Sequence, residues 1–145
     1  MEEIEMTKRK KQWLRRYRKN ETKIERLEEK IYLINARMEG VKGIRISDEP
    51  KGTSSVSQAE LLSDKMDIEE RIKRLKIKSR QLKNEICNAI DTLENEKHVE
   101  VLESYFIDGL SFEEIAVKIN RTPRRAIWLY SDAIEAINID FNNLS

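Results

Sequence analysis

The chain has 145 residues, of which 38% are charged and 39% are hydrophobic. Four glycines and two prolines are too few for a turn-rich β-sandwich or barrel, so the composition predicts an all-α protein. One cysteine excludes an internal disulfide framework, and one cysteine with one histidine excludes the usual structural zinc sites. The longest apolar run has five residues, 126–130, and the basic N-terminal stretch lacks a following apolar segment. We therefore expect no membrane span, no secretory signal and a cytoplasmic location.

A first long helix is predicted from Lys8 to Glu39, where apolar residues recur in alternating steps of three and four. Such a narrow apolar seam is typical of a helix that lies along another helix. We expect this helix to end at Gly40. The seam residues are Trp13, Tyr17, Asn20, Ile24, Leu27, Ile31, Ile34 and Met38.

A flexible loop is predicted over 40–56, because this segment holds three glycines, Pro50 and several hydroxyl residues. Ser57, with Glu60 three residues later, predicts the N-cap of a second long helix. Two matching seams joined by a loop predict a long antiparallel coiled-coil hairpin over 1–95, with pairing to other chains as the alternative. The second seam comprises Leu61, Lys65, Ile68, Ile72, Leu75, Ser79, Leu82, Ile86, Ala89 and Leu93.

Several large apolar residues lie off both seams and would be exposed on an isolated hairpin. We expect another part of the protein to cover some of them. They are Leu14, Tyr32, Leu33, Leu62, Met66, Ile77 and Ile90.

In the segment 97–137 the apolar residues recur over shorter stretches, which predicts three short helices, followed by a tail over 138–145. Three helices with two tight turns form the architecture of a helix-turn-helix, whose second helix enters the DNA major groove. A purely structural trihelical core is the alternative. The predicted helix ends are as follows. The first helix stops at Gly109, and the second begins with a capping box of Ser111 and Glu114 and ends at a left-handed Asn120. The third begins with Thr122 as its N-cap and Pro123 in the first helical position.

A resemblance to a known family is carried by Leu102, Tyr105, Gly109, Leu110, Ser111, Glu113, Glu114, Ile115, Ala116, Ile119, Asn120, Thr122, Arg124, Arg125, Ala133, Ile134 and Ile137. This stretch resembles region four, the DNA-binding region of sigma factors. It is more closely similar to phage late-gene transcription regulators of the ArpU and RinA type, as is the loop around Pro50. The resemblance implies an auxiliary DNA-binding regulator rather than a complete initiation factor, with double-stranded DNA and host RNA polymerase as partners.

The resemblance also implies DNA-contacting residues at the start of the last helix. Arg121 and Thr122 would approach phosphates, and Arg124, Arg125 and Trp128 would face base edges. Arginine can make bidentate contacts with guanine, whereas tryptophan is more often a core or interface residue. Ser131 and Asp132 would lie at the far end of the helix.

The charge of the segment 97–137 is poorly suited to DNA, with five basic against seven acidic residues. Two runs without acids compensate: Lys8 to Lys19 has eight basic residues and Arg71 to Lys83 has seven. We expect these runs to add phosphate contacts from the hairpin stem. The alternative is that they are solvated faces paired with nearby acids.

Enzymatic activity, cofactors and metals are not expected. His98 has no nucleophile partner and is interpreted as a capping or surface residue, while Cys87 is interpreted as a packed hydrophobe. The leading hypothesis is a sequence-specific DNA-binding regulator of phage or prophage origin that acts as a homodimer. The alternatives are a protein-binding module without direct DNA contact and a small terminase subunit that assembles as a ring.

Overall fold

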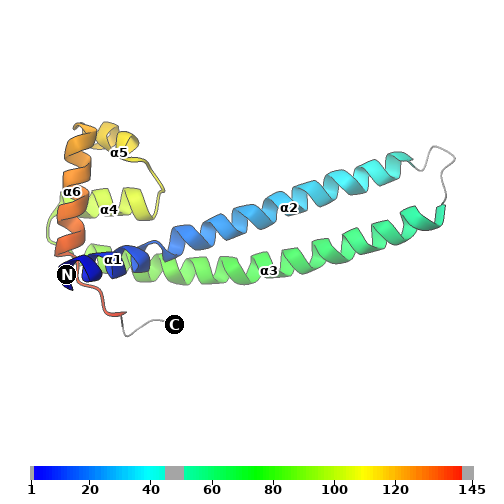
Figure 1. Ribbon diagram of the computed structural model, residues 1–145, viewed down its shortest axis with the longest axis horizontal. Coiled ribbons are helices and arrows are strands. Elements are labelled where there is room, and N and C mark those ends of the chain that lie inside the picture. The colour runs from blue at the N-terminus through cyan, green and yellow to red at the C-terminus, as the bar shows by residue number, and fades with distance from the viewer. Residues whose placement is uncertain (1, 45–50, 142–145) are drawn as a thin grey trace. The chain divides into compact units, whose positions relative to one another are not determined.

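The computed structural model describes residues 2–44 and 51–141, with side chains over 2–40 and 58–141. The described residues form helices without any strand, which confirms the all-α prediction (Figure 1). No helix within these ranges combines the length and apolarity needed to cross a membrane. The helices are α1 (Glu2–Leu14), α2 (Arg16–Ile44), α3 (Lys51–Asp91), α4 (Glu96–Phe106), α5 (Phe112–Ile119) and α6 (Pro123–Ala136).

The chain divides into two compact units that do not follow the predicted boundary at residue 96. Unit 1 comprises residues 1–19 and 79–145, and unit 2 comprises residues 20–78. The boundary differs because α1 and the C-terminal end of α3 share one hydrophobic core with α4, α5 and α6. Ile139 and Phe141 also pack against this core, so the described part of the predicted tail belongs to unit 1. Residues 142–145 lie outside the described residues.

The core of unit 1 is built around four aromatic rings, Tyr105, Phe106, Phe112 and Tyr130. Their centroids lie 4.9 to 5.8 Å apart in stacked and edge-to-face pairs. Such pairs add about 0.5–1.5 kcal/mol to the burial of their surface. Segments distant in sequence complete the core with Leu14, Ile86, Ile90, Val101, Leu102, Ile115, Ala126, Ala133, Ile134 and Ile137, which are all at most 1% exposed.

The off-seam apolar residues divide between the two units. Leu14 and Ile90 are 0% and 1% exposed in unit 1, so the expected cover exists for them. The remaining five stay exposed in unit 2. They are Tyr32, Leu33, Leu62, Met66 and Ile77.

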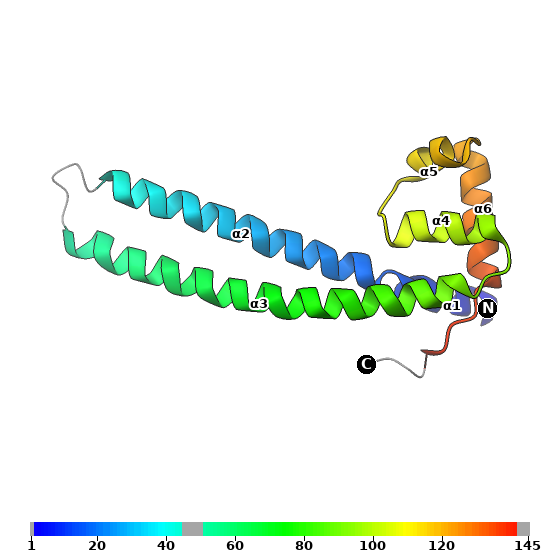
Figure 2. The same cartoon turned by 180° about the vertical axis from the view of Figure 1, so that it is seen from behind.

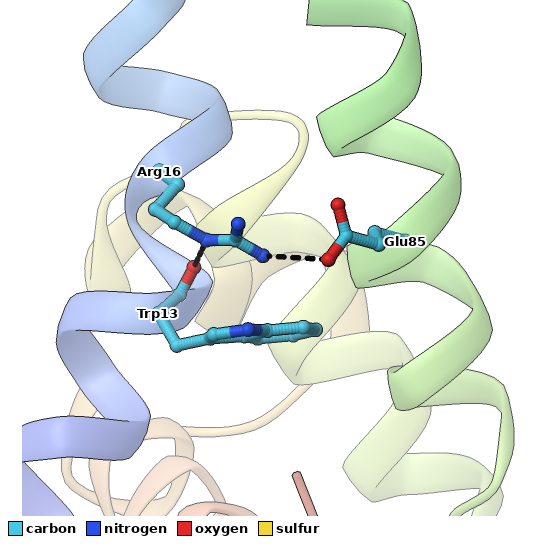
Figure 3. Close-up of polar contacts among 3 residues, drawn as sticks. All are labelled: Trp13, Arg16 and Glu85. Carbon is cyan, nitrogen blue, oxygen red and sulfur yellow. Dashed lines mark hydrogen bonds and ion pairs between the residues drawn. The ribbon is translucent and has the colours of Figure 1, made fainter. Parts of the chain in front are cut away.

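The first predicted helix is interrupted at Arg15, between α1 and α2. Figure 3 shows Arg16 next to the interruption, where its Nε donates to the Trp13 carbonyl at 2.9 Å and its Nη2 lies 3.3 Å from Glu85 Oε1. The guanidinium also stacks on the Trp13 indole at 4.5 Å from the ring centroid. Both Trp13 and its neighbour Leu14 are buried, which a single straight seam would not achieve.

Unit 2 consists of parts of α2 and α3 that run side by side in opposite directions (Figures 1 and 2). Ile24, Leu27 and Ile72 form its buried centre. Asn20, the polar member of the seam, is 4% exposed and donates through Nδ2 to the Leu75 carbonyl at 2.8 Å. The two helices are thus joined by an apolar seam and by the buried side-chain amide of Asn20.

The predicted loop over 40–56 is wrong for most of its length. Residue 40 does not end a helix, because α2 continues to Ile44, and α3 already begins at Lys51. Ser57 therefore lies inside α3 and is not an N-cap. A glycine costs a helix interior only about 0.5–1 kcal/mol relative to alanine, so glycines alone do not stop an established helix. Residues 45–50 lie outside the described residues.

The helix caps and stops predicted for the last three helices are confirmed. Gly109 has a φ of +71° after the end of α4, and the hydroxyl of Ser111 accepts from the backbone N–H of Glu114 in a complete capping box. Asn120 adopts the left-handed conformation with φ 56° and ψ 50°. Thr122 is the N-cap of α6, with Pro123 at its start.

Candidate nucleic-acid interface

The turn between α5 and α6 is fixed by backbone hydrogen bonds and by small side chains. Left-handed Asn120 reverses the chain, and the N–H of Arg121 donates to the Ala116 carbonyl at 2.9 Å. Ala116 and Ala126 are 2% and 0% exposed, so neither helix carries a bulky side chain at these positions. Ile115 and Leu129 fill the space between the helices. The buried face of α6 is thereby set against α5.

One face of α6 remains exposed along its length. Trp128 is 52% exposed and Ile127 is 47% exposed, whereas Leu129 is 3% exposed. At 3.6 residues per turn, the exposed residues fall on the side of the helix opposite the core. The structure therefore brings together most of the predicted site on one surface. This surface is formed by Arg124, Arg125, Ile127, Trp128 and Ser131.

The arginines at the start of α6 are not drawn into the core. The guanidinium of Arg125 lies over the Trp128 indole, with its Cζ 4.3 Å from the ring centroid. Arg121 donates to the carbonyl of Asn120 at 3.0 Å. For Arg124, the described residues provide no hydrogen bond or ion pair. The Thr122 hydroxyl oxygen accepts from the Arg125 N–H at 3.1 Å, which leaves its O–H as a donor.

The far end of α6 is bound by residues that sequence reasoning did not assign to it. Lys10 of α1 donates to the carbonyls of Ile134 and Glu135, both at 3.1 Å, and so satisfies backbone groups in the last turn of the helix. Burial lowers the pKa of Lys10, and the Glu135 carboxylate acts in the opposite direction. No local sequence pattern indicates this contact, because Ile134 and Glu135 are 124 and 125 residues away from Lys10 in the sequence.

His98 is not the capping or surface residue that the sequence favoured. It is 7% exposed, and its Nε2 lies 2.9 Å from Asp132 Oδ2, which joins α4 to α6. Asp132 is consequently committed to an intramolecular contact.

A polar contact also links α4 and α5. Lys118 donates from Nζ to the buried Ser104 hydroxyl at 2.9 Å, and the same nitrogen lies 3.8 Å from Asp108 Oδ2. At the start of α5, the Ser111 backbone N–H donates to Glu114 and lowers the pKa of that carboxyl. These contacts hold the helix that supports α6.

Several basic residues of the run from Lys8 to Lys19 make contacts within unit 1. Its arginines stack on rings of the core or bond to its polar groups: for example, the Arg9 Cζ lies 4.4 Å from the Phe141 ring centroid. The basic residues with such contacts are Arg9, Lys10, Lys11, Arg15 and Arg16, and the Arg18 guanidinium lies beside Gly109. Lys8, Arg9, Arg15 and Lys19 remain exposed, so phosphate contact by this run stays a prediction.

Metal chemistry has no candidate in the described part of the chain, where no group of three or more histidine, cysteine, aspartate or glutamate side chains could hold an ion. Burial, followed by the nearby Glu103 carboxylate, raises the pKa of the Cys87 thiol, which makes it a poor nucleophile at neutral pH. Comparison with family models, curated proteins and solved structures finds no match.

Proposed function

We propose that this chain is a sequence-specific DNA-binding transcription regulator that reads the major groove with α6. In this proposal α5 and α6 act as the helix-turn-helix of a trihelical module, and α2 and α3 form an antiparallel coiled-coil hairpin. The observation that carries the proposal is the exposed face of α6, which presents Arg124, Arg125 and Trp128 beside the capped start of the helix.

The side chains on this face suit direct readout of bases. An arginine guanidinium can donate two hydrogen bonds to guanine, which discriminates against the wrong base by about 1–3 kcal/mol. Stacking of Arg125 on Trp128 restricts the guanidinium before binding, so that binding to a base costs less side-chain entropy. Arg121 and the Thr122 hydroxyl donate toward phosphates, and Ser131 contacts the groove further along α6.

The biological setting comes from the resemblance to phage late-gene regulators of the ArpU and RinA type. We infer a phage or prophage regulator that works in the cytoplasm as a homodimer, with host RNA polymerase as a partner. The protein has no catalytic role in this scheme, and binding requires no cofactor.

The second candidate function is a protein-binding module without direct DNA contact. It is favoured by apolar side chains on the exposed surface of α5 and α6, where Val117 is 82% exposed and Trp128 is 52% exposed. Tryptophan is enriched at the energetic centres of protein interfaces. A small terminase subunit is a third candidate, which a ring-sized oligomer in sedimentation would favour.

The experiment uses the full chain and a duplex selected by it from a random library. We expect Arg124→Ala to lower the ratio of affinities for selected and random duplexes about 5- to 150-fold, which corresponds to removal of one base-reading interaction. Arg80→Ala is the control, because Arg80 is an exposed arginine on α3 and should leave the ratio unchanged. Equal losses on both duplexes would reject base reading by Arg124. Binding to polymerase alone, abolished by Trp128→Ala, would favour the protein-binding module.

A further inference from the structure

Unit 2 has two faces that differ in charge. One is marked by a shallow groove between α2 and α3, lined on α2 by Lys30, Leu33, Ile34 and Arg37, and on α3 by Leu61, Asp64, Asp67 and Ile68. We call this side the groove face. The other is marked by the ion pair between Lys76 Nζ and Glu28 Oε2 at 3.8 Å. Glu28 precedes Lys30 by two residues, about 200° around the helix, so the ion pair lies on the opposite side of the unit.

Helical periodicity extends the groove face along both helices. On α2, Arg26 and Lys23 precede Lys30 by four and seven residues and therefore lie in the same row. On α3, the row continues from Asp67 in steps of four, three and four. These steps reach Arg71, Arg74 and Lys78.

Six basic side chains thus line two neighbouring rows of the groove face, and all six are exposed. Within the part of the chain that the structure describes, none of them has a hydrogen bond or an ion pair. In contrast, Lys76 on the opposite face pairs with Glu28. The six residues are Lys23, Arg26, Lys30, Arg71, Arg74 and Lys78, which we call the basic rows.

The groove itself carries two acids, Asp64 and Asp67, whereas the other acidic residues beside the basic rows lie elsewhere on the helices. Glu21 and Glu25 precede Glu28 by seven and three residues, which sets them on its side of α2. Glu69 precedes Lys76 by seven residues and shares its side of α3. Glu29 and Glu70 point outward, away from the partner helix of the unit. The six residues of the basic rows outnumber Asp64 and Asp67, so the groove face carries a local positive field that the nearly neutral net charge of the chain conceals.

A second copy of the chain is a poor occupant for this face. A two-fold axis along the helices would bring α2 of one copy onto α3 of the other, and an axis across them would bring α2 onto α2. Wherever the basic rows of the two copies overlap, both arrangements oppose like charges, and juxtaposed like charges disfavour association. A polyanion instead releases the counterions condensed on it when it meets such rows.

We propose that the basic rows are a second DNA-binding surface, which holds the phosphate backbone of duplex DNA without reading its sequence. This surface deepens the proposed function, since it serves the same partner, but it is separate from the base-reading face of α6. It differs from the basic run expected from Arg71 to Lys83, because it takes only one side of that run and adds a row from α2.

The test compares two triple variants of the full chain with equal changes in net charge. The first, Arg26→Gln, Arg71→Gln and Arg74→Gln, removes charge from the basic rows. The matched control, Lys73→Gln, Lys76→Gln and Arg80→Gln, removes the same charge from exposed positions on the opposite side of α3. Binding to a random-sequence duplex is measured between about 50 and 200 mM salt, a range over which phosphate binding weakens strongly.

We expect the first variant to bind random duplex more weakly and to flatten the slope of log K against log salt by about 0.9 for each phosphate that is no longer neutralised, or nearly 3 in all. The control should keep the wild-type slope. A double variant, Lys23→Gln with Lys78→Gln, should flatten the slope by about 2 and provides a second measurement with milder substitution. Circular dichroism of each variant confirms that the helices persist.

The results separate this proposal from base reading by α6. If α6 does not read bases, the selected and random duplexes bind equally, yet the slope still depends on the basic rows. If the basic rows do not touch phosphates, both triple variants show the same slope of log K against log salt. The wild-type protein still prefers the selected duplex in that case. Equal slopes would therefore overturn the proposal, as would a change in the mass of the DNA-free protein caused by the first variant alone.

Discussion

Replacing Leu14 with alanine tests whether α1 is part of the C-terminal core. Leu14 is 0% exposed and packs among residues of α3 to α6, although it lies in the first helix of the chain. Truncation of a fully buried leucine to alanine costs about 2–5 kcal/mol, from reduced burial and from the cavity that remains. With a urea m-value of about 1–3 kcal/mol/M, a destabilisation near 3 kcal/mol lowers the unfolding midpoint of unit 1 by about 1–3 M.

The assay follows urea unfolding by the fluorescence of Trp13, which is buried in the same core, in a Trp128→Phe background. Leu33→Ala is the matched control: Leu33 is 54% exposed in unit 2, and its truncation should change stability by no more than about 0.5 kcal/mol. A cost below about 1 kcal/mol for Leu14→Ala, or equal costs at both leucines, would refute the assignment of α1 to the core of unit 1.

Two further outcomes concern α6. Thr122→Ala should lower the free energy of unfolding in urea by about 1 kcal/mol, because no hydroxyl then accepts from the Arg125 N–H. Thr122→Ser should retain most of the stability. Equal losses in the two variants would contradict the role of Thr122 as the N-cap. Burial, followed by the nearby Tyr105, raises the pKa of Tyr130 to about 12. An unfolded tyrosine ionises near pH 10, so the unfolded chain loses its proton first and stability falls as the pH rises from about 10 to about 12. The stability difference between wild type and Tyr130→Phe should shrink over this range, by up to about 2–3 kcal/mol, and a constant difference would contradict the buried hydroxyl.

Local signals in the sequence were sufficient for the last three helices. Ser111 with Glu114, Asn120 and Thr122 satisfy or redirect backbone groups within a few residues, so their roles can be interpreted without knowledge of the tertiary fold. Helical periodicity separates the exposed residues of α6, Arg124, Arg125, Trp128 and Ser131, from the buried residues Ala126, Leu129 and Ala133.

The features that sequence reasoning missed depend on contacts between distant segments. Lys10 at the end of α6 and Arg16 beside Glu85 carry no local pattern that marks them as partners. Nothing near His98 in the sequence indicates its partner Asp132, so the sequence favours a surface position. The loop prediction over 40–56 was wrong for another reason: glycine and serine content does not outweigh the tendency of a formed helix to continue.

The division of unit 1 between the two ends of the chain has a consequence for biosynthesis. Residues 20–78 emerge from the ribosome before most of unit 1 exists, so unit 2 can fold while the ends of unit 1 are still apart. The hydrogen bond between Asn20 and Leu75 then shortens the loop that the Arg16–Glu85 pair must close, and the entropic cost of closure grows with loop length. Unit 2, if it folds first, thus lowers the entropic cost of bringing together the two chain segments that form the core of unit 1.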